Sequence, residues 1–271
     1  MNPIVPSNPK VASTPAAPPA APSPSQTSPA ASPAASTDHF APSSAAAPPA
    51  PTVWARTIKE EGPTFSVDMS VPQVLDPLNE KGSEALSDRL SACATRELNA
   101  FRGEYERPLL PDEMKGGVWE GYRTTFQNDR LLGLQIVSSE FTGGAHPLSG
   151  ISTVLYDRKE GRELNLGDLF KQGSDYLGTI SKSAIESLSR QDSSRDMGWV
   201  RQGAAPQAEN FSAFTPTPEG LKFTFQQYQV DSYASGTPEV TVPWSALQSM
   251  LRPDSAVMPL ATAALAKHPQ P

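Results

Sequence analysis

Proline, alanine and serine dominate the first 52 residues, and this bias limits the fold more than any other feature of the sequence. The segment holds 14 Pro, 14 Ala and 9 Ser, and its only charged side chains are Lys10 and Asp38. Such a segment has too little apolar surface to offset the entropy lost on ordering. We therefore expect residues 1–52 to be a disordered, semi-extended tether and the folded body to begin near Val53.

The net charge belongs to the body. The chain has a formal net charge of −7, and Lys10 and Asp38 cancel within the tether. An acidic body without a Lys/Arg cluster argues against nucleic acid and against an anionic membrane surface as partners. The charge is compatible with a basic protein partner, but ordinary solubility is the simpler explanation for it.

Targeting signals are not visible in the sequence. No run approaches the roughly 20 apolar residues of a membrane span, and no charged segment followed by an apolar core opens the chain. A Pro-rich tether ahead of a compact body is nevertheless typical of exported bacterial proteins. We expect a periplasmic or extracellular protein whose signal or lipid anchor is not visible here.

Hydrophobic periodicity predicts alternating strands and helices in the body. Residues 53–72 contain a strand at "TFSVDMSVP", and Ser83–Phe101 is predicted to be a helix capped by Ser83. A hairpin is predicted from residues 118–127 and 131–141 around Asn128-Asp129. Further along, the pattern predicts a strand at 151–157, a helix at 174–190, a mobile loop at 191–210, strands at "LKFTFQQYQV" and "EVTVPW", and a helix at 244–251.

This order of elements predicts an α+β fold. We expect a mostly antiparallel sheet with helices packed on one face. The expected organisation is a tether at 1–52, a small strand–helix subdomain at 53–117, a main domain at 118–252 and a frayed tail at 253–271.

The body contains few groups that could carry catalysis. His39 lies in the tether and His268 in the tail, which leaves His146 alone in the body, and Cys93 is the single cysteine. These counts exclude an internal disulfide and a thiolate zinc site and disfavour a histidine-rich metal site. No G-x-S-x-G elbow, HExxH motif or phosphate loop is present. We therefore expect no catalytic residue, no metal and no cofactor.

Two loops supply candidate binding residues. Gly143 and Gly144 predict a turn with positive φ, in which His146 either hydrogen-bonds to backbone or contacts a ligand. Tyr228 and Tyr233 are either partner anchors at a loop rim or core residues.

Three segments in order carry a resemblance: "TGGAHP", "LYDRKEGRELNLGDLF" and "EGLKFTFQQYQVDSYASGTPEVTVPWSAL". Together, over about residues 118–252, they resemble the RsiV-like C-terminal extracellular domain family. This domain of unknown function is found in the lysozyme-sensing anti-sigma factor, in surface lipoproteins and alongside peptidoglycan deacetylases. The matching residues are Gly161, Leu164, Leu166, Asp168, Leu169 and Phe170 in the middle segment, and Tyr228, Tyr233, Ala234 and Gly236 in the last.

The resemblance implies a non-catalytic binding module outside the cytoplasm, with lysozyme or peptidoglycan as the expected partner. It departs from the family at Ser232, where members often carry proline. The alternatives are a cell-wall hydrolase or deacetylase accessory that uses His146, and a structural envelope spacer. The candidate ligand-binding residues are Gly143, Gly144, His146, Tyr228, Ser232, Tyr233 and Gly236.

Overall fold

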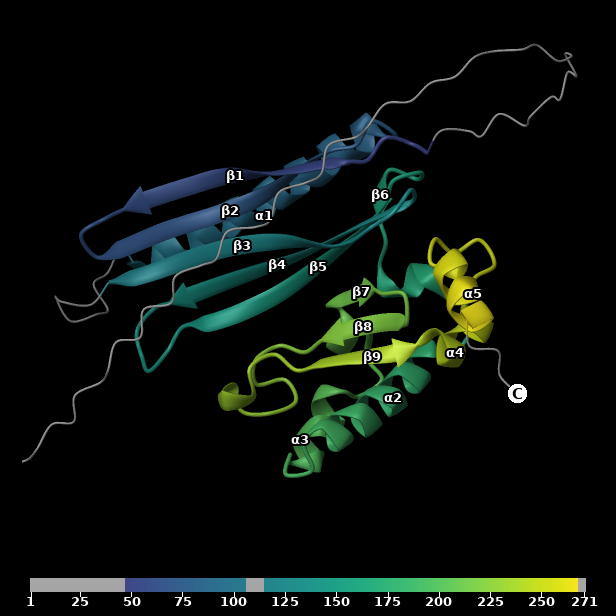
Figure 1. Ribbon diagram of the computed structural model, residues 1–271. Helices are drawn as coiled ribbons and strands as arrows, with labels where there is room; N and C mark the ends of the chain where they lie inside the picture. The colour runs from purple at the N-terminus through teal and green to yellow at the C-terminus, as the bar shows by residue number, and fades with distance from the viewer. Residues whose placement is uncertain (1–46, 106–114, 268–271) are drawn as a thin grey trace, which may run out of the picture. The chain divides into compact units, whose positions relative to one another are not determined.

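The computed structural model describes residues 47–105 and 115–267 (Figure 1). The expected tether therefore lies almost entirely outside the described residues, as do His39 and His268. All of the elements below belong to one compact unit, residues 46–271.

Six strands form the first sheet, in the order β1-β2-β3-β4-β5-β6. All neighbouring pairs are antiparallel except β2 and β3, which run parallel. Parallel neighbours need a crossover connection, and helix α1 lies between these two strands in the chain. The bounds are β1 Thr52–Glu61, β2 Phe65–Leu75, α1 Glu80–Tyr105, β3 Gly116–Gln127, β4 Leu131–Phe141, β5 Leu148–Asp157 and β6 Arg162–Glu163.

Helix α1 covers one face of this sheet (Figure 1). Side chains point alternately to the two faces of a strand, so every second residue of β2 to β5 meets the helix. The helix contributes apolar residues three or four positions apart, which share one of its faces. The resulting core contains Val67, Met69, Val71, Val118, Leu132, Leu134, Ile136, Val154 and Tyr156 from the strands, and Leu86, Leu90, Ala94, Leu98 and Phe101 from α1.

The start of α1 differs from the prediction. Asn79 caps the helix, because its Oδ1 atom accepts a hydrogen bond from the Gly82 amide at 3.1 Å. Ser83 lies inside the first turn, where its hydroxyl accepts from the Asp76 amide at 3.0 Å and donates to the Glu80 carbonyl at 2.8 Å. The expectation that Ser83 caps the helix is therefore wrong, since this hydroxyl fastens the preceding loop to the helix instead.

The second sheet has three antiparallel strands in the order β7-β8-β9. Helices that precede and follow these three strands in the chain contribute to the core of the sheet. Trp244, Phe223 and Ile180 are among its fully buried side chains. The bounds are α2 Tyr176–Gln191, α3 Met197–Gly203, β7 Phe214–Pro216, β8 Gly220–Thr224, β9 Glu239–Pro243, α4 Trp244–Leu247 and α5 Met258–Lys267, with 3-10 turns at Leu166–Leu169, Ala208–Phe211, Tyr233–Ser235 and Gln248–Met250.

The α+β class with mostly antiparallel pairing is confirmed, whereas several details differ. Residues 191–210 contain α3, and the segment expected to be a frayed tail contains α5, which is fixed by the buried Val257 and Ala261. The strand expected to reach Val230 ends at Thr224. The expected subdomains 53–117 and 118–252 share one sheet, because β2 in the first pairs with β3 in the second.

Candidate functional site

The loop between β4 and β5 carries the glycine pair and His146. Gly143 has φ of 108° and Gly144 has φ of 106°. These angles lie in the region that glycine adopts without steric cost, so the predicted positive-φ turn is confirmed. The turn brings His146 to the surface beside residues that lie more than 80 positions later in the chain.

A tight turn at residues 226–229 presents Tyr228. The Gln229 amide donates to the Gln226 carbonyl at 3.1 Å, and Tyr228 occupies the third position with φ of 64°. This sign at this position is that of a type II turn, which ordinarily has glycine or asparagine there. A tyrosine in the left-handed region costs about 1 kcal/mol.

Neighbouring groups hold Tyr228 in this conformation. The Trp199 indole N–H donates to the Tyr228 carbonyl at 2.9 Å. The Gln229 side chain accepts from the Gln226 amide and donates to the carbonyls of Gly203 and Asn210, all at 2.9 Å. Strained backbone fixed in this way is concentrated at functional sites, which makes this turn a candidate.

His146, Tyr228 and Tyr233 meet to form what we call the aromatic rim. The His146 ring stacks on Tyr233 with a centroid distance of 3.6 Å and an interplanar angle of 16°. Its Nδ1 atom lies 3.0 Å from the Pro147 carbonyl oxygen, and its Nε2 atom lies 3.2 Å from the Tyr228 hydroxyl. Because a carbonyl only accepts, Nδ1 carries a proton and donates it to Pro147, while Nε2 and the Tyr228 hydroxyl share a hydrogen bond.

The loop that carries Tyr233 is tied to the body through Asp231. The carboxylate accepts from Arg195 Nε at 2.8 Å and from the Ser232 amide at 2.7 Å. Hydrogen bonds from the Ser235 side chain, the Ser232 amide and the Arg195 side chain lower the pKa of Asp231. Gly236 ends the short turn that begins at Tyr233, with φ of 64°. Loop and body are thus joined by a charge-assisted contact.

The structure brings most of the predicted site residues together. Gly143 and Gly144 position His146, whose ring contacts both Tyr228 and Tyr233, whereas Ser232 and Gly236 flank Tyr233 in the loop. Sequence reasoning missed Trp199, which lies in the segment expected to be a mobile loop. The sequence "DMGW" contains a signal for the start of the helix that carries Trp199, since aspartate is a favoured N-cap residue. Asp196 Oδ1 caps α3 by accepting from the amides of Gly198 at 2.7 Å and Trp199 at 3.2 Å.

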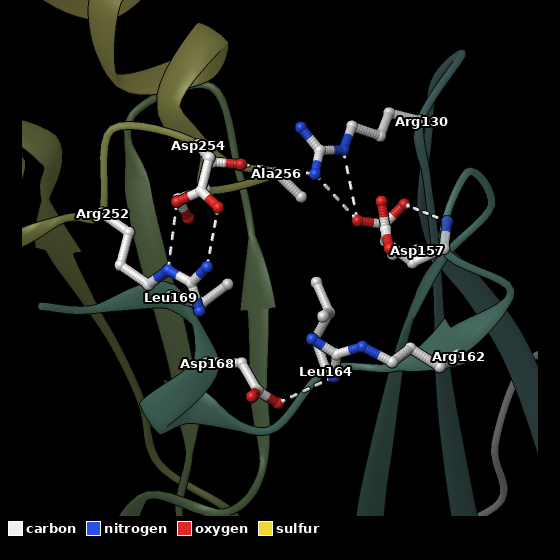
Figure 2. Close-up of a pocket in the computed structure, with 11 residues that line it drawn as sticks. Arg130, Asp157, Arg162, Leu164, Asp168, Leu169, Arg252, Asp254 and Ala256 are labelled. Atoms are coloured by element: carbon white, nitrogen blue, oxygen red, sulfur yellow. Dashed lines mark hydrogen bonds and ion pairs between the residues drawn. The ribbon is translucent and has the colours of Figure 1, made fainter. Parts of the chain in front are cut away.

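A charged cavity of about 140 Å³ lies elsewhere in the same unit (Figure 2). Figure 2 shows three arginines directed at it, each with a carboxylate partner: Arg130 with Asp157, Arg162 with Asp168, and Arg252 with Asp254. Arg130 also reaches the Asp254 carbonyl at 3.4 Å. The opposite charges compensate one another within the cavity. We therefore interpret its ion pairs and hydrogen bonds as structural contacts that join the first sheet to the segment preceding α5.

Residues 47–105 and 115–267 contain no group of three or more His, Cys, Asp or Glu side chains placed to hold a metal ion. Over the same ranges, no helix combines the length and apolarity needed to cross a bilayer.

Comparison with known proteins relates part of this chain to a family of unknown function. Residues 167–245 match the family model described as "Protein of unknown function (DUF3298)", and this segment lies inside the expected main domain, 118–252. Two solved structures of DUF3298 family proteins are similar. One, from Bacteroides fragilis NCTC 9343, has a TM-score of 0.59 and 14% identity, and the match covers 80% of this chain and 98% of that one.

The second structure, from Pseudomonas aeruginosa PAO1, has a TM-score of 0.53 and 17% identity, and the match covers 76% of this chain and 96% of that one. At these identities the two structures establish the fold. A curated relative, peptidoglycan-N-acetylmuramic acid deacetylase PdaC of Bacillus subtilis (strain 168), is 26% identical over 198 residues, or 72% of this chain. The chain spans 41% of that relative's length. The finer RsiV-like assignment stays a prediction.

Proposed function

We propose that this chain is a non-catalytic binding module that acts outside the cytoplasm, in the periplasm or extracellularly, and recognises a cell-wall-related ligand. The observation that carries the proposal is the aromatic rim, in which a half-buried His146 stacks on Tyr233 and hydrogen-bonds to Tyr228. Stacked aromatic side chains at loop tips bury large areas at low entropic cost, as in many binding surfaces.

The similarity to a peptidoglycan deacetylase supports a role at the cell wall and a location where peptidoglycan is found. Two ligands fit this role. Peptidoglycan offers sugar rings that can pack on aromatic faces, and lysozyme is the partner implied by the RsiV-like resemblance. A basic protein would also be drawn to a chain with a formal net charge of −7.

The hydrolase alternative would need a carboxylate to orient and polarise His146. Among the described residues, the hydrogen-bond partners of the His146 ring are the Pro147 carbonyl and the Tyr228 hydroxyl. These contacts favour a binding role, in which the ring is a rigid part of a surface. The structural-spacer alternative predicts that neither cell-wall ligand binds.

The test is a titration of the full chain with hen lysozyme and a sedimentation assay with purified peptidoglycan, each at low and moderate salt. Tyr233→Ala is expected to weaken binding about tenfold and to leave the melting temperature nearly unchanged. Trp54→Ala is the matched control, because this aromatic side chain is 47% exposed and lies on β1, outside the rim. Undiminished binding by Tyr233→Ala, or no binding by the wild-type chain, would contradict the proposal.

A further inference from the structure

A groove of about 310 Å³ adjoins the aromatic rim. Its lining includes Arg123, Gln135 and Val137 from the first sheet, and Gln227, Thr237 and Glu239 from the C-terminal part of the chain. Gln227 directly precedes Tyr228, and Gly236, which also lines the groove, ends the turn that begins at Tyr233. The groove is therefore lined by residues that flank the segment carrying Tyr228 and Tyr233. Its volume is at the lower end of small-molecule sites.

The groove presents hydrogen-bond donors that the protein itself does not use. Arg123 Nε donates to Gln135 Oε1 at 2.8 Å, and Gln227 Oε1 accepts from the Ser149 amide at 3.0 Å. Each of these contacts fixes which end of the glutamine amide carries the nitrogen, because Arg123 Nε and the Ser149 amide only donate. Among the described residues, the Nε2 groups of both glutamines and the two Nη groups of Arg123 have no protein acceptor.

Gln135 provides the sharpest signal. The residue is only 5% exposed, yet it lines the groove, and its Nε2 group is not sealed in the interior, because the buried side-chain atom without a partner in the described residues is Ser255 Oγ. The remaining N–H of Gln135 can therefore donate to an acceptor atom of a ligand in the groove.

The charge balance of the groove favours an anion. The carboxylate of Glu239 is already paired, because both of its oxygens lie 3.0 Å from Lys222 Nζ. Arg123 has no carboxylate partner among the described residues, and the side chain is exposed. A guanidinium with two unused Nη groups matches the planar geometry of a carboxylate.

We propose that this groove binds a carboxylate-bearing sugar, with the acid group at Arg123 and the sugar oxygens accepting from Gln135 and Gln227, while the adjoining rim packs against a ring. The proposal rests on the proposed function and deepens it, because it specifies the chemistry of the ligand. Neutral glycans lack the group that Arg123 recognises and are expected to bind more weakly.

The experiment uses the full chain and two soluble probes. One is the disaccharide of N-acetylglucosamine and N-acetylmuramic acid, which carries a carboxylate, and the other is the neutral disaccharide of N-acetylglucosamine. Calorimetry measures the two dissociation constants, and NMR follows the side-chain NH₂ resonances of Gln135 and Gln227. The acidic disaccharide is expected to bind about tenfold more tightly and to shift both sets of resonances.

Arg123→Gln is expected to remove this preference. Arg56→Gln is the matched control, because Arg56 is exposed on β1 of the same sheet and the substitution changes the charge equally. Equal affinity for the two disaccharides, or a preference that persists in Arg123→Gln, overturns the inference. If peptidoglycan or lysozyme still binds through Tyr233 in that case, the proposed function stands without the groove. If the preference depends on Arg123 but is unaffected by Tyr233→Ala, the groove binds the ligand and the aromatic rim does not contribute to binding.

Discussion

The side-chain amide of Gln226 hydrogen-bonds to both backbone groups of Ile151, accepting from its N–H at 2.8 Å and donating to its carbonyl at 2.6 Å. Ile151 lies on the part of β5 that β6 does not cover, since β6 pairs only with Tyr156 and Asp157. The Gln226 side chain thus makes the two hydrogen bonds that the backbone of a neighbouring strand would make at this edge. The contact joins the first sheet to the turn that carries Tyr228.

Replacing Gln226 by alanine should therefore destabilise the protein by about 1–3 kcal/mol, because two partly buried backbone groups lose their partners. Urea unfolding of the wild type and the variant measures the change. Gln127→Ala, at an exposed position on β3, is the control and should change stability by less than about 0.5 kcal/mol. Equal effects of the two substitutions would show that the Gln226 contact contributes little.

Asp76→Asn should cost about 3–5 kcal/mol, because it leaves the charge of Arg158 buried and unpaired. Arg158 is 1% exposed, and its Nε and Nη2 atoms each lie 2.9 Å from a carboxylate oxygen of Asp76. Asp68→Asn is the matched control, since its ion pair with Lys59 is exposed and should contribute about 0–1 kcal/mol. A cost at position 76 no greater than at position 68 would contradict the prediction.

Glu120 should make stability decrease as pH rises. Burial, together with the nearby charge of Glu97, raises the pKa of Glu120 to about 7, whereas an unfolded chain has a glutamate pKa of about 4.3. Between these values the folded state retains a proton that the unfolded state releases, so the free energy of unfolding falls with pH and the penalty is complete above pH 7.

Glu120→Gln removes that penalty. Since the side chain is partly exposed, we expect a gain of about 1–2 kcal/mol at pH 8 and almost none at pH 4. Urea unfolding at several pH values between these limits measures the difference. A gain that is constant across the series would mean that the substitution acts through packing rather than through charge.

Replacing Tyr228 by glycine should destabilise the protein less than replacing it by alanine. Both substitutions remove the ring, but only glycine relieves the left-handed backbone, so Tyr228→Gly should be about 1 kcal/mol more stable than Tyr228→Ala. Urea midpoints of the two variants measure this difference. At Gln127, on strand β3, the alanine variant should instead be more stable than the glycine variant. The same order of stability at both positions would contradict the turn assigned to Tyr228.

Local chemistry explains which parts of the fold could be predicted from sequence. The hairpin of β3 and β4 was predicted because its side chains alternate and Asn128 marks the turn, where its Oδ1 atom accepts from the amides of Arg130 and Leu131. Strand β1 was missed because its residues are largely exposed, which removes the alternation. Helix α5 was missed because docking of Val257 and Ala261, and not its own polarity pattern, holds it in place.

The candidate site was predictable by residue type but not by geometry. Positive φ at Gly143 and Gly144 follows from glycine itself, whereas stacking of His146 on Tyr233 depends on how two distant loops meet. Trp199 was missed for the same reason, since its indole bonds to a carbonyl 29 positions away. The unused amide of Gln135 becomes visible only when both sheets are in place.

The core of the second sheet determines which fragments of this chain can fold by themselves. Leu131 of β4 and Leu155 of β5 belong to the same buried cluster as Trp244 and Phe223. Residues 167–245, which match the DUF3298 family model, therefore share their buried core with strands that precede them in the chain. Because α1 packs on the opposite face of those strands, we expect a fragment that folds by itself to include α1, β4 and β5, whereas residues 167–245 alone would expose apolar surface to water.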